Sequence, residues 1–368
     1  MKNVLVVFGT RPEAIKMCPL VWELKRRPAF SVSVCVTGQH RGMLDQVLDA
    51  FSVVPDHDLA IMREGQTLFD VTSKVLFGMK GVLMAARPDL VLVHGDTTTA
   101  FATALACFYL GIPVGHVEAG LRTYDLSSPF PEEWNRRAVA LLAAYHFAPT
   151  ERAREHLLRE GIVSSAVYVT GNTVVDALGM TVREDYEHPL LAFGLGSRLI
   201  LLTAHRRENL GAPMAACFRA IRRVVERHSD VKVICPVHRN PAVRAVAEEA
   251  FSGCHQIRMT EPQGVIPFHN LLARCYAVLT DSGGIQEEAT ALGKPVLVLR
   301  DTTERPEGIA AGTLRLVGTQ PDQIEKEFDR LLTDPAAYRG MTGGNNPYGD
   351  GNACHRIADI LEAELFKF

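Results

Sequence analysis

The turn formed by Ser282, Gly283 and Gly284 combines residue types that suit phosphate binding. It lies between an apolar strand pattern and a helical pattern in the segment TDSGGIQEEA. Glycines let backbone N–H groups approach a phosphate, and the start of a helix favours an anion. A glycine-rich turn without a ligand is common, but serine, two glycines and a helix start together favour the phosphate interpretation. Glu288, one turn into the helix, could accept hydrogen bonds from ribose hydroxyls.

Two further segments carry cations directly after a strand pattern. His205, Arg206 and Arg207 follow LILLT and form a local cationic patch of the kind that a diphosphate needs. Near the amino terminus, GTRPEAIK places Arg11 and Lys16 at a predicted helix start, where the neighbouring threonine, proline and glutamate already account for capping. Because this position favours anions, a phosphate role for Arg11 and Lys16 is preferred over solvated surface charges.

Carboxylates end two apolar strand patterns in the first half of the chain. Asp96 follows LVLVHG and is either a helix cap or a catalytic group, and its position alone does not separate the two. Glu118 emerges from GIPVGHVE, and burying a carboxylate there without a purpose is costly, which favours a functional role. Both should open into one crevice, because neighbouring parallel strands end side by side. By spacing alone, Glu132 and Glu133 are first-turn glutamates that the helix dipole stabilises.

Three other segments leave their interpretation open. His238 in VHRNP is a second phosphate contact or only a turn before a proline, and Arg305 in RDTTERPEG could by itself belong to a charged surface turn. NNPYGDG is turn chemistry with Tyr348 as a candidate lid or docking residue. The G-x-G-x-x-G fingerprint is absent after the first strand and no Cys/His metal spacing occurs, so neither NAD nor a metal is expected.

Short apolar, β-branched runs that alternate with helical patterns position these residues. Continuous apolar strands of this kind predict parallel sheets that helices cover on both faces. The alternation of strand and helix patterns occurs in two successive sets. Residues 181–197 separate the two sets of strands; this stretch is first charged and then contains proline and glycine. The sequence therefore predicts an α/β protein with two domains, 1–178 and 179–351. The last helix, 352–368, is expected to pack back on the first domain. The predicted strands are 4–8, 32–37, 90–94, 114–117, 146–148 and 167–170, then 199–203, 231–236, 257–259, 277–280 and 295–299.

Composition agrees with two buried cores. The chain has 368 residues, a length that exceeds the size at which a single hydrophobic core stops growing. Hydrophobic residues make up 47% of it. A formal net charge of -3 gives no overall attraction to nucleic acid or to an anionic membrane. No stretch reads as a signal peptide or a membrane span. The eight scattered cysteines are expected to be buried free thiols, which indicates a cytoplasmic protein.

Taken together and in order, these segments closely resemble the bacterial non-hydrolysing UDP-N-acetylglucosamine 2-epimerases. The resemblance covers essentially the whole chain and rests on the segments FGTRPEAIK, TGQHRGML, LVHGDTTTA, GIPVGHVEAGLR, SPFPEEWNR, TAHRREN, VHRNP, TDSGGIQEEA, VLRDTTERPEG and NPYGDG. It implies a fold of the glycosyltransferase B type, with two Rossmann-like domains and the active site in the interdomain cleft. It also implies a homodimer that supplies precursors of cell-surface polysaccharide.

The resemblance also implies roles for particular residues. It makes Asp96, Glu118, Glu132 and His205 catalytic, which replaces the capping interpretation of Glu132. It assigns the remaining substrate contacts as follows: Arg11 and Lys16 near the diphosphate and sugar, Gln263 and Phe268 at the uracil, Ser282, Gly283 and Gly284 at phosphate, Glu288 at the ribose and Arg305 at the diphosphate.

The implied chemistry inverts C2 of UDP-N-acetylglucosamine, a carbon that is not beside a carbonyl. The family expels UDP while removing the C2 proton, leaving 2-acetamidoglucal, and then adds UDP back after protonation on the other face. No metal and no cofactor is needed, and the partners are UDP-N-acetylglucosamine and UDP. A glycosyltransferase, a hydrolysing 2-epimerase that releases N-acetylmannosamine, and a non-catalytic sugar-nucleotide sensor are the alternatives.

One departure from the family concerns a second substrate site that some bacterial relatives use for activation. That site has a glutamine and an arginine where this chain has Gly42 and Gly65, although Gln39, Glu132, Arg206 and His238 still match it. Losing two polar side chains would weaken the site, so activation by substrate is not expected.

Overall fold

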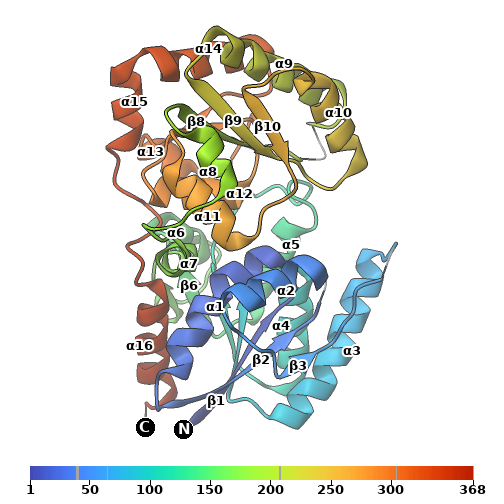
Figure 1. The fold of residues 1–368 in the computed structure, drawn as a ribbon. Coiled ribbons are helices and arrows are strands. Elements are labelled where there is room, and N and C mark those ends of the chain that lie inside the picture. Colours follow the sequence, from blue (N-terminus) through green and yellow to red (C-terminus); the bar gives the residue numbers. More distant parts are fainter. Residues whose placement is uncertain (39–40, 64, 207–208, 304, 368) are drawn as a thin grey trace. The chain divides into compact units, whose positions relative to one another are not determined.

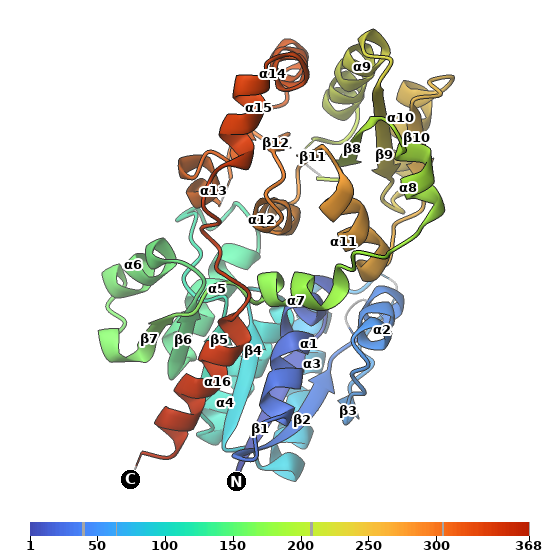
Figure 2. The same ribbon diagram turned by 60° about the vertical axis from the view of Figure 1, so that its left-hand side comes forward.

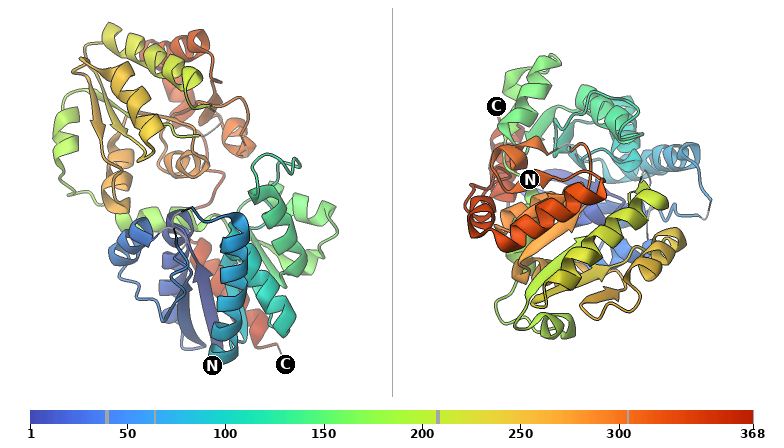
Figure 3. Two further views of the ribbon diagram at one scale, coloured as in Figure 1. Left: turned by 90° about the vertical axis from the view of Figure 1, so that its right-hand side faces the viewer. Right: turned by 90° about the horizontal axis from the view of Figure 1, so that it is seen from above.

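The protein is described by a computed structural model that covers residues 1–38, 41–63, 65–206, 209–303 and 305–367 (Figure 1). It divides into two compact units. Unit 1 comprises Met1–Met180 and Tyr348–Phe368, and unit 2 comprises Thr181–Pro347. The sequence pattern predicts that the chain enters the second domain at residue 179 and returns to the first domain at residue 352. The chain begins and ends on the same side of unit 1 (Figure 3).

Unit 1 is built on a seven-stranded sheet in the order β3-β2-β1-β4-β5-β6-β7. Every strand pair is parallel, as the continuous apolar runs predict. Residues 4–8 of β1 are all buried, because helices cover both faces of the sheet. The strands are β1 (Lys2–Phe8), β2 (Phe30–Val36), β3 (His57–Asp58), β4 (Leu90–His94), β5 (Val114–Val117), β6 (Tyr145–Ala148) and β7 (Val167–Val169).

The helices of unit 1 form two layers. α3 packs on α4 and α4 on α5, whereas α1 packs on α2 and on the last helix, α16 (Figure 2). Arg27, two residues after α1, pairs with Asp359 at 2.6 Å and Glu362 at 2.8 Å on α16. The helices are α1 (Arg11–Lys25), α2 (Arg41–Ala50), α3 (Leu68–Ala86), α4 (Thr98–Leu110), α5 (Glu132–Leu142), α6 (Glu151–Arg159), α7 (Thr173–Thr181) and α16 (Ala353–Leu365), with a 3-10 turn at Ser164–Ala166.

Unit 2 repeats the plan with a six-stranded parallel sheet in the order β10-β9-β8-β11-β12-β13. Its helices also cover both faces. The strands are β8 (Arg198–Thr203), β9 (Val231–Pro236), β10 (Ile257–Thr260), β11 (Ala277–Thr280), β12 (Val296–Val298) and β13 (Leu314–Leu316). The helices are α8 (Pro189–Gly194), α9 (Ala212–Arg227), α10 (Pro241–Phe251), α11 (Val265–Arg274), α12 (Gly283–Ala291), α13 (Pro306–Ala310), α14 (Pro321–Thr333) and α15 (Pro335–Thr342).

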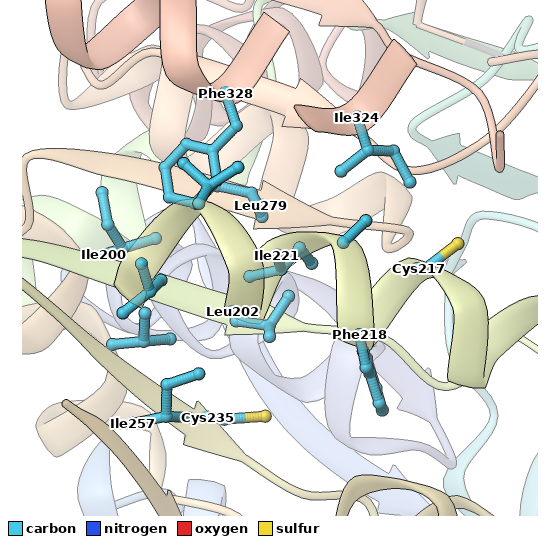
Figure 4. Packing of buried hydrophobic residues seen from close by; sticks show 14 of the residues in the cluster. Ile200, Leu202, Cys217, Phe218, Ile221, Cys235, Ile257, Leu279, Ile324 and Phe328 are labelled. Atoms are coloured by element: carbon cyan, nitrogen blue, oxygen red, sulfur yellow. The ribbon is translucent and has the colours of Figure 1, made fainter. Parts of the chain in front are cut away.

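The larger core of unit 2 lies between the sheet and α9, α10 and α14. Phe218 and Ile221 of α9 and Phe328 of α14 pack over Ile200 and Leu279 of the sheet (Figure 4). Each of these five side chains is at most 1% exposed, and burial of this kind contributes about 1.5–3 kcal/mol per large apolar side chain. Because the strands are fixed by this core, the loops at their carboxyl ends start from rigid positions.

All eight cysteines are buried and none forms a disulfide, which confirms the expectation of free thiols. Burial raises the pKa of the Cys18 and Cys235 thiols to about 12, so they stay protonated at neutral pH. Within the described ranges, no helix combines the length and the apolar character needed to cross a bilayer.

Candidate active site

The strand order of each sheet reverses direction once, between β1 and β4 in unit 1 and between β8 and β11 in unit 2. In open parallel sheets, ligands bind beside the carboxyl ends of the strands at such a switch point. In unit 1, Arg11 follows β1, Asp96 follows β4 and Glu118 follows the adjacent β5. In unit 2, His205 follows β8 and Ser282 follows β11. Arg11 and Asp96 thus flank the switch point of unit 1, with Glu118 one strand away, and His205 and Ser282 flank the switch point of unit 2.

Glu13 joins the two loops at the switch point of unit 1. Its Oε2 accepts hydrogen bonds from the backbone N–H groups of Gly9 at 3.0 Å and Thr10 at 2.8 Å, and its Oε1 accepts from the Thr97 hydroxyl at 2.6 Å. This confirms the predicted capping box at the start of α1. Burial raises the pKa of Glu13, against the opposing effect of these hydrogen bonds. Gly9 is required because a Cβ there would lie 2.0 Å from the Thr37 hydroxyl.

Asp96 does not cap α4, because Thr97 takes that position and accepts from the N–H of Ala100 at 3.1 Å. Its carboxylate is instead paired with Arg136 of α5, whose Nε lies 3.0 Å from Oδ2 and whose Nη2 also contacts Oδ2. The neighbouring Asn135 donates to the Asp96 carbonyl at 2.9 Å. The Asp96 side chain keeps 24% of its surface exposed, so it is both oriented and accessible.

Glu118 lies in the left-handed region, with φ of +61°, and its side chain is only 8% exposed. A glutamate held in this region is uncommon and points to a functional constraint. Its Oε2 accepts from Lys16, forms a 2.9 Å hydrogen bond with Nδ2 of Asn172 and lies 3.7 Å from Nε2 of His94. The contacts with Lys16 and Asn172 hold the carboxylate at the end of β5, one strand away from Asp96.

His116 is fully buried, and in the sequence it lies between Asp96 and Glu118. Its Nε2 lies 2.7 Å from the Gly95 carbonyl, which can only accept, so Nε2 carries the proton of a neutral ring. Consistently, Nδ1 has no hydrogen-bond partner within the described ranges. Burial, more than any other cause, lowers the pKa of His116 to about 3 and that of its neighbour His146 to about 4. The bond to Gly95 links β5 to the turn that carries Asp96.

Acid should therefore destabilise unit 1. Because the pKa of His116 is depressed in the folded state, His116 is protonated in the unfolded chain at a pH at which it is still neutral in the folded chain. The free energy of unfolding therefore falls as the pH is lowered from 6.5 to about 3. The variant His116→Gln can keep a donor near Gly95 but has no group that titrates in this range. Between pH 7 and pH 5 its free energy of unfolding should fall by about 2 kcal/mol less than that of the parent. Urea unfolding followed by tryptophan fluorescence measures the difference. The exposed His255→Gln is the control, and equal losses in parent and His116→Gln would contradict the assignment.

Glu132 and Glu133, the first two residues of α5, have different surroundings. Glu133 is fully buried and accepts from the backbone N–H groups of Thr123 and Tyr124, both at 3.0 Å. It therefore anchors the loop that precedes α5. Glu132 is half-buried at the first residue of the helix.

His205 and His238 meet beyond the carboxyl ends of β8 and β9, two neighbouring strands of unit 2. Their rings are stacked, with centroids 5.3 Å apart and planes within 5°. His238 also accepts from the backbone N–H of Asn240 at 3.1 Å, in the turn that starts α10. Burial and the nearby His205 lower the pKa of His238. His238 is thus both part of a turn and a neighbour of His205.

The Ser-Gly-Gly turn lies where the sequence predicts it, with Ser282 preceding α12 and Gly283 beginning it. The N–H of Ser282 donates to the Thr280 hydroxyl at 3.0 Å. Glu288 of the same helix faces His269, with 3.7 Å between Oε2 and Nε2. The other ring nitrogen of His269 lies 2.7 Å from the Thr181 hydroxyl, so this buried histidine supports Glu288.

Arg305 does not belong to a charged surface turn. It is 7% exposed, and its Nε donates to Oε1 of Glu287, a residue 1% exposed, at 2.6 Å. Gln263 lies just before α11 and donates to the Glu261 carbonyl at 2.7 Å. Phe268 is 8% exposed and belongs to the core between α11 and the sheet. The structure thus keeps Arg305, Gln263 and Phe268 in unit 2, with Arg305 and Phe268 buried.

A family model described as UDP-N-acetylglucosamine 2-epimerase matches residues 22–362. The chain belongs to this 2-epimerase family. It is 56% identical over 359 residues to the UDP-N-acetylglucosamine 2-epimerase of Bacillus subtilis, covering 98% of this chain and 94% of that protein. It is 51% identical over 369 residues to that of Escherichia coli K12, covering 98% of both.

Solved structures of the 2-epimerase family share the fold. A structure of the UDP-N-acetylglucosamine 2-epimerase of Neisseria meningitidis, bound to UDP-N-acetylglucosamine, is 47% identical with a TM-score of 0.93, covering 98% of this chain and 100% of that one. Together with the two parallel sheets, this confirms the predicted glycosyltransferase B type with two Rossmann-like domains.

Sequence reasoning missed the residues that hold the predicted ones. Arg136, Asn172 and Glu287 each contact a predicted residue far away in sequence or on another element. Only Arg136 gave a signal, because it is a charge on the apolar face of α5. The suggestion that Tyr348 is a lid is wrong, since this side chain is 2% exposed inside unit 1.

The remaining predictions concern the second substrate site, Arg207 and a metal site. Gln39 and Arg207 lie outside the described residues. At Gly42 and Gly65 an added Cβ would meet nothing within 4 Å, but Gly65 has a φ of +70°, where any side chain would be strained. Across the described ranges, no three His, Cys, Asp or Glu side chains are grouped to hold a metal ion.

Proposed function

We propose that the protein is a non-hydrolysing 2-epimerase that interconverts UDP-N-acetylglucosamine and UDP-N-acetylmannosamine. The observation that carries the proposal is the pair of carboxylates at adjacent strand ends, Asp96 held by Arg136 and Glu118 held by Lys16 and Asn172. Two oriented carboxylates suit a reaction that moves a proton on two faces of one carbon. The full-length match to relatives named as 2-epimerases supports the same substrate.

The chemistry follows from the position of C2. Its hydrogen is not activated by a carbonyl, so one carboxylate removes the proton as the C1–O bond to the diphosphate breaks. The electron pair of the C–H bond forms a C1–C2 double bond, and UDP leaves with the pair of the C–O bond. In the return step a carboxylate protonates C2 from the opposite face and a diphosphate oxygen bonds to C1. Nothing is oxidised or reduced overall.

The residues of the two units would divide this work. Asp96, Glu118 and Glu132 serve the sugar in the proposal, and Arg11 and Lys16 stabilise the charge that develops on the diphosphate. His205, Arg305 and the turn Ser282 to Gly284 bind the same diphosphate, whereas Glu288 binds the ribose and Gln263 and Phe268 the uracil. Backbone N–H groups at the start of α12 suit an anion because the helix dipole favours it.

The decisive experiment is incubation with UDP-N-acetylglucosamine in D2O without added cofactor, followed by proton NMR. UDP-N-acetylmannosamine carrying deuterium at C2 is the expected product. Free N-acetylmannosamine and UDP as the only products would indicate a hydrolysing enzyme instead. Unlabelled substrate with no second sugar nucleotide would overturn the proposal and favour sugar transfer to an acceptor.

We further propose that the protein is a homodimer through α3 and α4, which pack together in unit 1. Phe69, Phe77 and Met84 lie on α3 with 88%, 75% and 59% exposure, and Phe108 and Tyr109 end α4 with 62% and 67%. Exposed apolar side chains gathered on neighbouring helices indicate a protein interface. We expect Phe77→Lys to shift the sedimentation coefficient from dimer to monomer, whereas Val163→Lys, an exposed apolar residue elsewhere, should not. A parent protein that sediments as a monomer would exclude the dimer.

The cell biology in the proposal is a cytoplasmic enzyme that supplies N-acetylmannosamine units for a cell-surface polysaccharide. Eight buried free thiols suit a reducing compartment. Cells that lack the enzyme should lose N-acetylmannosamine from that polymer, which sugar analysis of the isolated polymer would show. An unchanged sugar composition would exclude this role.

A further inference from the structure

Asp281 connects the two loops at the switch point of unit 2. It follows β11 and is 1% exposed. Its Oδ2 accepts from the backbone N–H groups of His205 at 2.7 Å and Arg206 at 2.8 Å, which belong to the loop after β8. Nε of Arg206 returns a 3.3 Å hydrogen bond to the Asp281 carbonyl. One carboxylate oxygen therefore fixes the backbone that carries His205.

The second oxygen of Asp281 is in a different situation. Oδ1 is buried and has no hydrogen-bond partner among the described residues. A buried carboxylate oxygen without a partner is costly and uncommon, and it calls for an explanation. A candidate partner is Nδ1 of His205, 3.5 Å away, a distance slightly longer than a hydrogen bond. A small rotation of the imidazole would close it.

The ring of His205 is held so that its two nitrogens have different environments. One face stacks on His238, and the side chain is still 39% exposed. Nδ1 is directed to Asp281, and Nε2 lies on the opposite edge of the ring. Asp281 and His238 face the ring, and the neighbouring Arg206 donates from Nε to the Asp281 carbonyl at 3.3 Å.

We propose that Asp281 is the positioning residue of His205: its Oδ1 accepts Nδ1–H, which fixes the tautomer and stabilises the imidazolium, so that Nε2–H donates to the diphosphate when UDP leaves. An anionic carboxylate next to Nδ1 favours the charged ring. The electron pair of the C1–O bond goes to the diphosphate oxygen, and the Nε2–H hydrogen bond stabilises that charge without a further bond being made. The inference rests on the proposed function for its substrate.

Asp281→Asn tests the proposal with little change of shape. The amide oxygen can still accept from the two backbone N–H groups, but its NH₂ group would face Nδ1, which must then become an acceptor and disfavours the imidazolium. We expect kcat to fall about 10²-fold or more while KM for UDP-N-acetylglucosamine changes less than about threefold, since a comparable change of tautomer in a catalytic triad costs about 10⁴-fold. Asp322→Asn, an exposed carboxylate of α14, is the matched control.

A spectroscopic readout separates this role from a structural one and from the proposed function. In ¹⁵N-histidine spectra of the UDP complex, with His205→Gln used to assign the signal, Nδ1 of His205 should be protonated in the parent and bare in Asp281→Asn. A bare Nδ1 in the parent complex, or a protonated Nδ1 together with an unchanged kcat in Asp281→Asn, would overturn the proposal. A parent enzyme without epimerase activity would refute the proposed function, but the spectra would still decide the Asp281 contact.

Discussion

Replacing Glu118 with glutamine should lower kcat at least about 100-fold and change the affinity for UDP less than about threefold. Glutamine has the shape of glutamate and keeps one oxygen that can accept from Lys16 and Asn172, so the loop after β5 should hold its conformation. It cannot take up the C2 proton, which is the reason for the loss. Steady-state kinetics with UDP-N-acetylglucosamine and calorimetric titration with UDP measure the two quantities.

Two companion variants make the result specific. Asp96→Asn should show the same separation of turnover from UDP binding, because Asp96 is the other oriented carboxylate of unit 1. Glu155→Gln, an exposed position of α6, should behave as the parent. Unchanged turnover in both Glu118→Gln and Asp96→Asn would remove the assignment of proton transfer to these carboxylates.

Replacing Arg305 with methionine should destabilise unit 2 by about 3–5 kcal/mol and weaken UDP binding. Arg305 and Glu287 are both buried and joined by a 2.6 Å hydrogen bond, so the substitution removes a cationic partner from a buried carboxylate. The double variant Arg305→Met with Glu287→Gln should regain part of the lost stability, because the buried charge is then gone. UDP binding should stay weak in both, since each lacks the guanidinium.

The two tryptophans allow the effect to be located. Trp22 and Trp134 both belong to unit 1, so their fluorescence follows that unit, whereas far-UV circular dichroism follows both. Urea unfolding of Arg305→Met should move the dichroism transition to lower urea and leave the fluorescence transition in place. A loss below about 1 kcal/mol, or a double variant as unstable as the single one, would show that Arg305 does not compensate a buried charge at Glu287.

Most strands could be predicted from the sequence because a parallel sheet buries both faces and leaves an uninterrupted apolar run. β4, β5, β9 and β11 lie where the pattern placed them. β3 and β13 were not predicted. β3 has two residues, and β13 reads Leu-Arg-Leu, with Arg315 paired to Glu327 at 2.6 Å, so neither shows the apolar run.

The sequence by itself determined the local features: which runs become strands, which turns precede a helix, and which polar residues stand at the ends of strands. Arg11, Asp96, Glu118 and Ser282 could be placed in this way because each lies within a few residues of the strand that carries it. Only the tertiary structure decided which groups meet. Arg136 reaches Asp96 from 40 residues away because α5 packs beside the loop after β4. Asp281 reaches His205 from 76 residues away because the neighbouring strands β8 and β11 end side by side at a switch point. In both cases packing rather than local sequence selects the partners.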